Sequence, residues 1–188
     1  MLLCKCLGGV YMKKAIVILA IMACVWVGYQ VYGHLESELA MASAAPSARW
    51  CTVLDEVSNR LTLAKTALGM FRKWLPERTS TIYAVETSIA KTMSSQTPDR
   101  TSAALVELEA SLSRLISEGM NSVWLMFSQR FTNVARDLDA NKGRVLIEIT
   151  RYNEAAYRFH MKASQFPFSL VASLSGTRDS WPSIQLPY

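Results

Sequence analysis

The clearest pattern in the chain is an uninterrupted apolar segment near its beginning. From Ala15 to Tyr32 the sequence reads AIVILAIMACVWVGYQVY, which contains no charged residue and has Gln30 as its one strongly polar side chain. A helix of this length reaches about 27 Å, close to the hydrocarbon thickness of a bilayer. The segment therefore predicts a transmembrane helix over residues 15–33.

Farther along the chain, apolar residues recur at alternating intervals of three and four, which is the spacing of one helix face. The first such seam starts at Trp50, with Ser47 placed to cap it, and Pro76 ends it. Lys142 is the only polar interruption in the last and longest seam. The spacing predicts four helices, over residues 50–75, 79–93, 102–118 and 124–166.

The length of the last predicted helix indicates how the others pack. About 40 residues of helix reach roughly 60 Å, which is more than one globular layer needs. Such a helix can pack along shorter antiparallel helices, or it can form an oligomeric coiled coil. We favour the bundle, because three other amphipathic segments each have a face to bury. The predicted fold is all-α: an N-terminal transmembrane helix followed by an elongated antiparallel bundle of about four helices.

The same pattern divides the chain into five parts. A basic N-terminal tail covers residues 1–14, and the anchor covers 15–33. Residues 34–48 include the small-residue stretch AMASAAPSA, interrupted by Pro46, which predicts a hinge. The bundle covers 49–176. The last part, 177–188, has two prolines and no helical period, so we expect a flexible tail.

Charge decides the expected topology. Lys5, Lys13 and Lys14 precede the span, whereas Glu36 and Glu38 follow it. This bias predicts a cytoplasmic N-terminus and an extracytoplasmic bundle. The rest of the chain carries 17 basic and 15 acidic residues, so no cationic face is expected and nucleic-acid binding is a poor interpretation.

A second interpretation of the anchor uses the same residues. With Met12 as the start, Ile21–Cys24 resembles a lipobox, in which Cys24 is lipidated after cleavage of a signal peptide. The apolar run continues past Cys24, which favours the retained span. Both interpretations attach the bundle to a membrane.

No residue pattern in the chain indicates a reaction, so no catalytic, cofactor-binding or metal site is predicted. Phosphate-binding loops, nucleophile elbows and metal-ligand spacings are absent from the sequence. Cys51 is alone in the bundle and is expected to be a packed side chain. The carboxylates of Glu107, Glu109, Asp137 and Asp139 are expected to face solvent.

One segment carries a more specific signal. Tyr152-Asn153, Phe159-His160 and Phe166-Pro167 follow one another at regular spacing, with Arg144-Val145 upstream and Leu170–Ala172 and Gly176 downstream. This order resembles the LemA family, whose last long helix carries a repeated Tyr-Asn motif followed by Phe-Pro and an apolar-Ala-Gly stretch. The second Tyr-Asn is changed in both residues here, and a Tyr-Pro expected near residue 118 is Gly119-Met120. The family-motif residues, taken as structural, are Arg144, Tyr152, Asn153, Phe166, Pro167, Ala172 and Gly176.

The resemblance implies a membrane-attached antiparallel helical protein. Because the family has no established catalytic activity, the resemblance implies no reaction. It also implies an outward N-terminus, against which the lysines argue. We expect a non-enzymatic structural or protein-interaction role at the cell envelope, with the lipid bilayer, unknown envelope proteins and self-association as partners. The alternative is an envelope-active effector such as a spanin-like lysis accessory, which host lysis on expression would distinguish. For Tyr152 we expect a buried ring whose hydroxyl bonds a neighbouring helix, and for Asn153 a bond to a backbone carbonyl.

Overall fold

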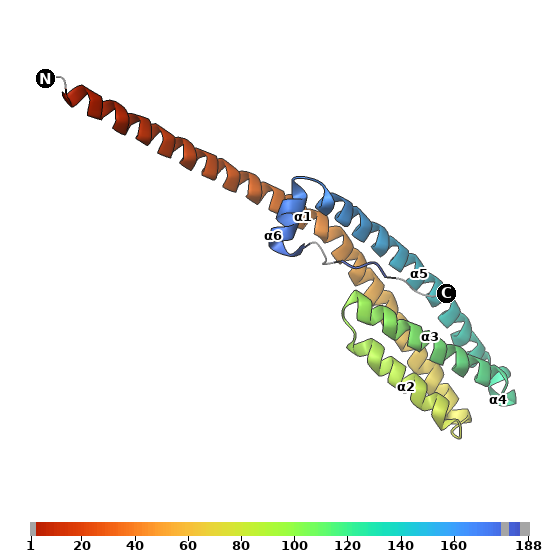
Figure 1. The fold of residues 1–188 in the computed structure, drawn as a ribbon. Coiled ribbons are helices and arrows are strands. Elements are labelled where there is room, and N and C mark those ends of the chain that lie inside the picture. Colours follow the sequence, from red (N-terminus) through yellow and green to blue (C-terminus); the bar gives the residue numbers. More distant parts are fainter. Residues whose placement is uncertain (1–2, 178–180, 185–188) are drawn as a thin grey trace.

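The computed structural model describes the backbone of residues 3–177 and 181–184, and side chains from residue 17 onward within those ranges. This part of the chain forms six helices and contains no strand (Figure 1). They are α1 (Leu3–Trp74), α2 (Thr79–Ser94), α3 (Pro98–Met120), α4 (Val123–Met126), α5 (Gln129–Ser164) and α6 (Phe168–Ser175). The predicted all-α fold, with a long apolar N-terminal helix and an elongated bundle, is confirmed.

Helix α1 is one continuous helix that projects far beyond the bundle (Figure 1). The apolar side chains of residues 17–31 are exposed, and α1 is the one helix of the described residues long and apolar enough to cross a membrane. Buried core residues begin at Leu39. Of the basic tail predicted over residues 1–14, the structure describes the backbone of residues 3–14, which belongs to α1, and none of the side chains.

The hinge predicted over residues 34–48 is wrong, as is the helix cap at Ser47. Pro46 lies inside α1 and is buried, although it has no N–H to donate to the preceding turn. Leu39 and Trp50, on either side of it, are both buried against the bundle. Packing on both sides therefore offsets the missing hydrogen bond, and the helix continues.

The bundle is arranged around the second half of α1. Helix α5 runs back along α1, and the α2–α3 hairpin packs against the distal part of α1 (Figure 1). The core is a line of fully buried side chains contributed by α1, α3 and α5, among them Phe71, Leu108, Leu112, Phe131 and Tyr152. A smaller cluster, at the end nearer the projecting helix, joins Leu39 of α1 to Phe159, Ala163, Val171 and Ala172.

The single long helix predicted over residues 124–166 is instead two helices with a break at Phe127 and Ser128. Ser128 is the N-cap of α5, and its hydroxyl accepts a hydrogen bond from the Phe131 N–H at 3.4 Å. Trp124 and Phe127 do not belong to the core seam, because they are 70% and 77% exposed. The polar residue in the seam is the fully buried Asn141, one position before the Lys142 that the spacing indicated.

The Phe-Pro segment turns the chain after α5. The Phe166–Pro167 peptide bond is cis, and α6 then packs against both α1 and α5. Phe166, the last residue of the helix predicted over residues 124–166, is 81% exposed, and the buried residues of this segment are Val171 and Ala172. Gly176 ends α6 with φ of 69°, a left-handed conformation that glycine adopts without a steric cost.

Candidate functional site

The Tyr-Asn motif on α5 holds the C-terminal segment. Tyr152 is fully buried, with its ring centroid 5.5 Å from that of Trp50. Its hydroxyl donates to the Pro182 carbonyl oxygen at 2.9 Å, and not to a neighbouring helix as expected. Burial raises the pKa of Tyr152 to about 12, with a smaller contribution from the Asp99 carboxylate.

Asn153 and His160 bind the same returning segment. The Asn153 amide donates to the Ile184 carbonyl at 2.7 Å and accepts from the Ile184 N–H at 2.8 Å. The His160 Nε2 nitrogen lies 2.7 Å from the Trp181 carbonyl oxygen, a geometry that requires the proton on Nε2. A side-chain amide thus provides both of the hydrogen bonds that a neighbouring β-strand would provide.

The prediction of a flexible tail over residues 177–188 is therefore wrong for residues 181–184. Ile184 is buried in the main core, and Trp181 packs against both apolar clusters. Residues 178–180 and 185–188 lie outside the described part of the chain. The sequence signal was present in Asn153 and His160, two polar residues beside buried positions of α5, but it did not identify what they bind.

The other motif residues lie elsewhere. Arg144 is exposed, and its Nε atom lies 3.5 Å from a carboxylate oxygen of Glu56 on α1. Ala172 is fully buried where α6 meets the bundle. Cys24 is exposed on the projecting apolar part of α1, and Cys51 is exposed too, so the expectation that Cys51 is packed is wrong.

A buried polar cluster lies in the middle of the bundle. Arg60 of α1 is 3% exposed, and its guanidinium pairs with the Glu109 carboxylate of α3 and donates to the Leu138 carbonyl of α5 at 2.7 Å. The Asn141 side chain lies 3.4 Å from Arg60 Nη1 and donates to the Glu56 carboxylate at 2.9 Å. One arginine thus joins three helices.

Glu109 corrects another expectation, because its side chain is only 16% exposed and is not a solvated surface charge. Glu107 is exposed and pairs with Lys91, as an exterior carboxylate would. Arg60 itself was missed, although residues 53, 57, 60, 64, 67 and 71 keep the three-four spacing of a buried face. A cation at one position of that spacing was the available signal.

A groove of about 720 Å³ separates α3 from α5 and ends on this cluster. Arg60 and Glu109 line it, and its walls are mostly apolar, with Val106 and Ile116 from α3 and Ala135 from α5. The polar residues along its edge are Ser113, Ser117, Asp139 and Lys142. No group of side chains suited to hold a metal ion occurs among the described residues.

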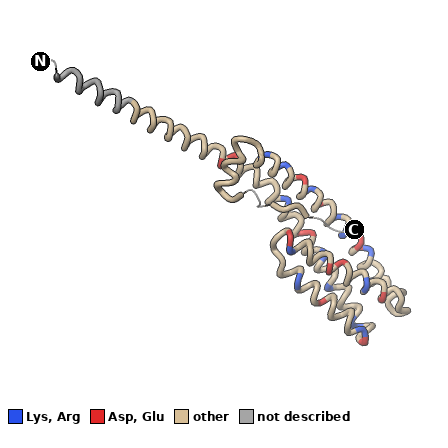
Figure 2. Tube along the Cα trace, viewed as in Figure 1, with Lys and Arg blue, Asp and Glu red and all other residues tan. Residues whose placement is uncertain are grey.

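Two carboxylates at opposite ends of the bundle have lowered pKa values. Hydrogen bonds from Arg114 and Thr81 hold the pKa of Glu118 below its usual range. At the other end, the hydrogen bond from Lys162 lowers the pKa of Glu38, which connects the end of α5 to α1. Figure 2 shows that Lys, Arg, Asp and Glu are spread along the bundle and absent from the described part of the projecting helix.

The fold defines a class of protein, an antiparallel helical bundle continuous with an exposed apolar N-terminal helix. The LemA family model matches residues 49–181, and the chain belongs to the LemA family. That range includes the Tyr-Asn pair on α5 and extends to Trp181 in the segment that the motif holds. A search of curated proteins finds no match.

Proposed function

We propose that this LemA-family protein is a membrane-anchored, non-enzymatic protein that acts as a structural or interaction element at the cell envelope. The observation that carries the proposal is the continuity of α1, whose exposed apolar part runs without a break into the buried core of the bundle. A helix of this kind transmits position and orientation from the bilayer to the bundle. The bundle is then a rigid rod standing on its anchor.

The chemistry of the bundle supports an interaction role. The buried Arg60–Glu109 pair lines the groove, but both side chains are engaged in joining helices. The groove walls are mostly apolar, and such a surface suits an apolar ligand or segment. Tyr152 and Asn153, the motif residues, hold the chain's own C-terminal segment and are not directed at an open cavity.

Membrane anchorage can be tested by extraction. Membranes that contain the full chain should retain it after an alkaline carbonate wash, because the apolar segment supplies an exposed helix of sufficient length. Changing Ile21 and Val25 together to Arg should release the chain, whereas Tyr83→Arg, at an exposed position on α2, should not. Retention of the Ile21→Arg/Val25→Arg variant would contradict anchorage by this segment.

The exposed Cys51 provides a test of topology. With Cys4, Cys6 and Cys24 changed to Ser, a membrane-impermeant maleimide should label Cys51 from the extracytoplasmic side of intact cells whose outer barrier is open. Cys51→Ser in the same background is the control. Labelling only after the membrane is permeabilised would overturn the proposed orientation. With Cys24 restored, the mass of the purified chain distinguishes the two interpretations of the anchor. A retained span leaves the chain uncleaved, whereas the lipobox interpretation gives a chain cleaved before Cys24 and carrying lipid on it.

A further inference from the structure

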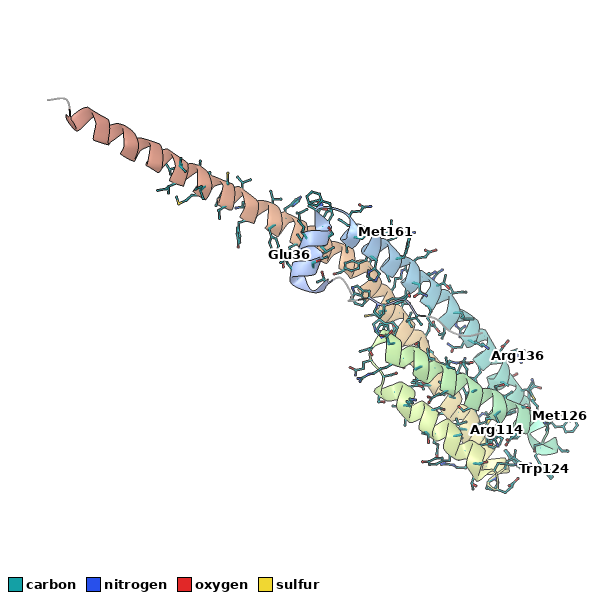
Figure 3. The ribbon with its side chains drawn as sticks, in the orientation of Figure 1. Glu36, Arg114, Trp124, Met126, Arg136 and Met161 are labelled. Atoms are coloured by element: carbon teal, nitrogen blue, oxygen red, sulfur yellow. The ribbon has the colours of Figure 1, made fainter. Side chains whose placement is uncertain are left out.

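The end of the bundle opposite the anchor exposes a group of large apolar side chains. We call Trp74, Val123, Trp124, Met126 and Phe127 the distal aromatic patch; they come from the end of α1 and from α4 with the residue after it. The Trp74 and Trp124 rings are stacked, with centroids 6.2 Å apart and planes 11° from parallel. Figure 3 shows Trp124 and Met126 at this end, far from Glu36 and Met161 beside the projecting helix.

The patch is held in place by the core beneath it. Leu125 of α4 is fully buried, whereas its neighbours on both sides along the chain are exposed. The Trp74 ring supports the Trp124 ring, and hydrogen bonds from Ser128 N–H to Leu125 and from Met126 N–H to Ser122 close the turns around α4. The aromatic side chains are thus displayed by a fixed backbone and have no partner in the chain's own core.

Positive charge predominates around the patch. Lys73 Nζ lies 5.6 Å from the Trp74 ring, in cation–π contact, and Arg72 pairs with Glu86 of α2. The segments that meet at this end, residues 72–86 and 114–137, contain six basic and four acidic residues. The rest of the chain beyond the span is nearly neutral.

This combination fits a lipid surface that carries negative charge. Trp rings favour the headgroup layer of a bilayer, and exposed apolar side chains beside Lys and Arg bind anionic interfaces through buried apolar area and charge. Docking on a second copy of the same patch would bring like charges together, which disfavours it. The charge therefore favours an anionic lipid surface over self-association.

The position of the patch decides which lipid surface it can reach. Helix α5 has 36 residues and thus extends about 54 Å from the patch toward the anchored end. Figure 3 places the patch and the projecting helix at opposite ends of the rod. We propose that the distal aromatic patch docks on an anionic lipid surface other than the bilayer that holds α1, so that the chain bridges two membranes. The bridging rests on the proposed anchorage of α1, whereas the lipid affinity of the patch does not.

Vesicle capture tests the proposal. The full chain is reconstituted into biotinylated vesicles of phosphatidylcholine, and labelling of Cys51 measures the fraction of bundles that face outward. Protein-free fluorescent vesicles containing phosphatidylglycerol are added and then counted on streptavidin beads. Capture is expected, with a decrease at high salt and little capture of fluorescent vesicles made of phosphatidylcholine alone.

Two matched variants identify the surface responsible. Trp124→Ser/Phe127→Ser removes two exposed aromatic rings from the patch and should lower capture by at least about tenfold. Tyr157→Ser/Phe166→Ser removes two exposed rings from the body and the opposite end of α5 and should leave capture unchanged. All four positions are exposed, so circular dichroism should show both variants folded. Equal capture by the two variants would overturn the proposal.

Two other outcomes are decisive. Capture only of fluorescent vesicles that themselves carry the chain would show that the occupant is a second copy and would overturn lipid docking. Loss of the chain from the donor vesicles during flotation would contradict the anchor. In that case the patch is tested directly, by co-flotation of the full chain with the phosphatidylglycerol vesicles; co-flotation that persists in Trp124→Ser/Phe127→Ser would overturn the proposal independently.

Discussion

Replacing Arg60 by Met tests whether the buried polar cluster holds the bundle together. Methionine has a similar length and fills the same space, so the cavity left behind is small. The cost comes from the partners: the Glu109 carboxylate loses its counter-ion, and the Leu138 carbonyl and the Asn141 side chain lose their donor. Breaking a buried ion pair typically costs 3–5 kcal/mol. Because Glu109 is 16% exposed and retains some water, we expect about 3 kcal/mol, near the lower limit.

Thermal unfolding of the full chain in detergent micelles, followed by circular dichroism, measures this cost. For a chain of this size, about 3 kcal/mol corresponds to a melting temperature lower by roughly 6–12 °C. Arg114→Met is the matched control, because Arg114 is an exposed residue of α3 paired with Glu118 one turn away (Figure 3). Its loss should cost at most about 1 kcal/mol.

The double variant Arg60→Met/Glu109→Leu separates the charge from the packing. Removing both charges leaves no unpaired carboxylate, so most of the lost stability should return. If Arg60→Met melted within a degree or two of Arg114→Met, the cluster would not join the helices energetically. A double variant no more stable than Arg60→Met would show that the unpaired Glu109 carboxylate is not the cause, and that the cost comes from the lost donor to Leu138 and Asn141 or from the packing of Arg60.

Three further predictions concern the C-terminal segment that α5 binds and the contact between Gly119 of α3 and Phe131 of α5. Asn153→Ala loses both hydrogen bonds to Ile184 and should cost about 1–3 kcal/mol of stability. Hydrogen exchange at the Ile184 amide should accelerate in this variant. Unchanged protection of that amide would contradict the contact. Gly119→Ala should cost about 1–3 kcal/mol, because its Cβ would clash with the buried Phe131 ring. Phe131→Leu should relieve part of that cost in thermal melts, and an unchanged melting temperature of Gly119→Ala would refute the clash. The folded state favours neutral Tyr152, so the contribution of Tyr152 to the stability of the fold is complete below a pH of about 10 and is lost as the pH rises through about 12. The melting temperature should therefore fall in this alkaline range. If Tyr152→Phe showed the same alkaline fall, Tyr152 would be excluded as its cause.

The three-four spacing was enough to predict an all-α fold and the approximate bounds of α2 and α3, and the uninterrupted apolar run predicted the exposed part of α1. These features depend on short-range patterns of apolar residues, which are written directly in the order of the residues. The family also followed from the order alone, because Tyr152-Asn153 and Phe166-Pro167 kept their spacing, and the match over residues 49–181 confirms it. What those residues contact did not follow from that order.

Tertiary contacts decided the remaining features. Pro46 reads as a break in the sequence, but packing of Leu39 and Trp50 on either side keeps α1 continuous. Glu109 reads as a surface charge, but it pairs with the buried Arg60 of another helix, 49 positions away in the chain. The C-terminal segment has no pattern of its own, so its order comes from a side-chain amide on α5. Local periodicity determines which segments become helices, whereas burial of polar groups depends on partners that are distant in the chain and meet only when the helices pack.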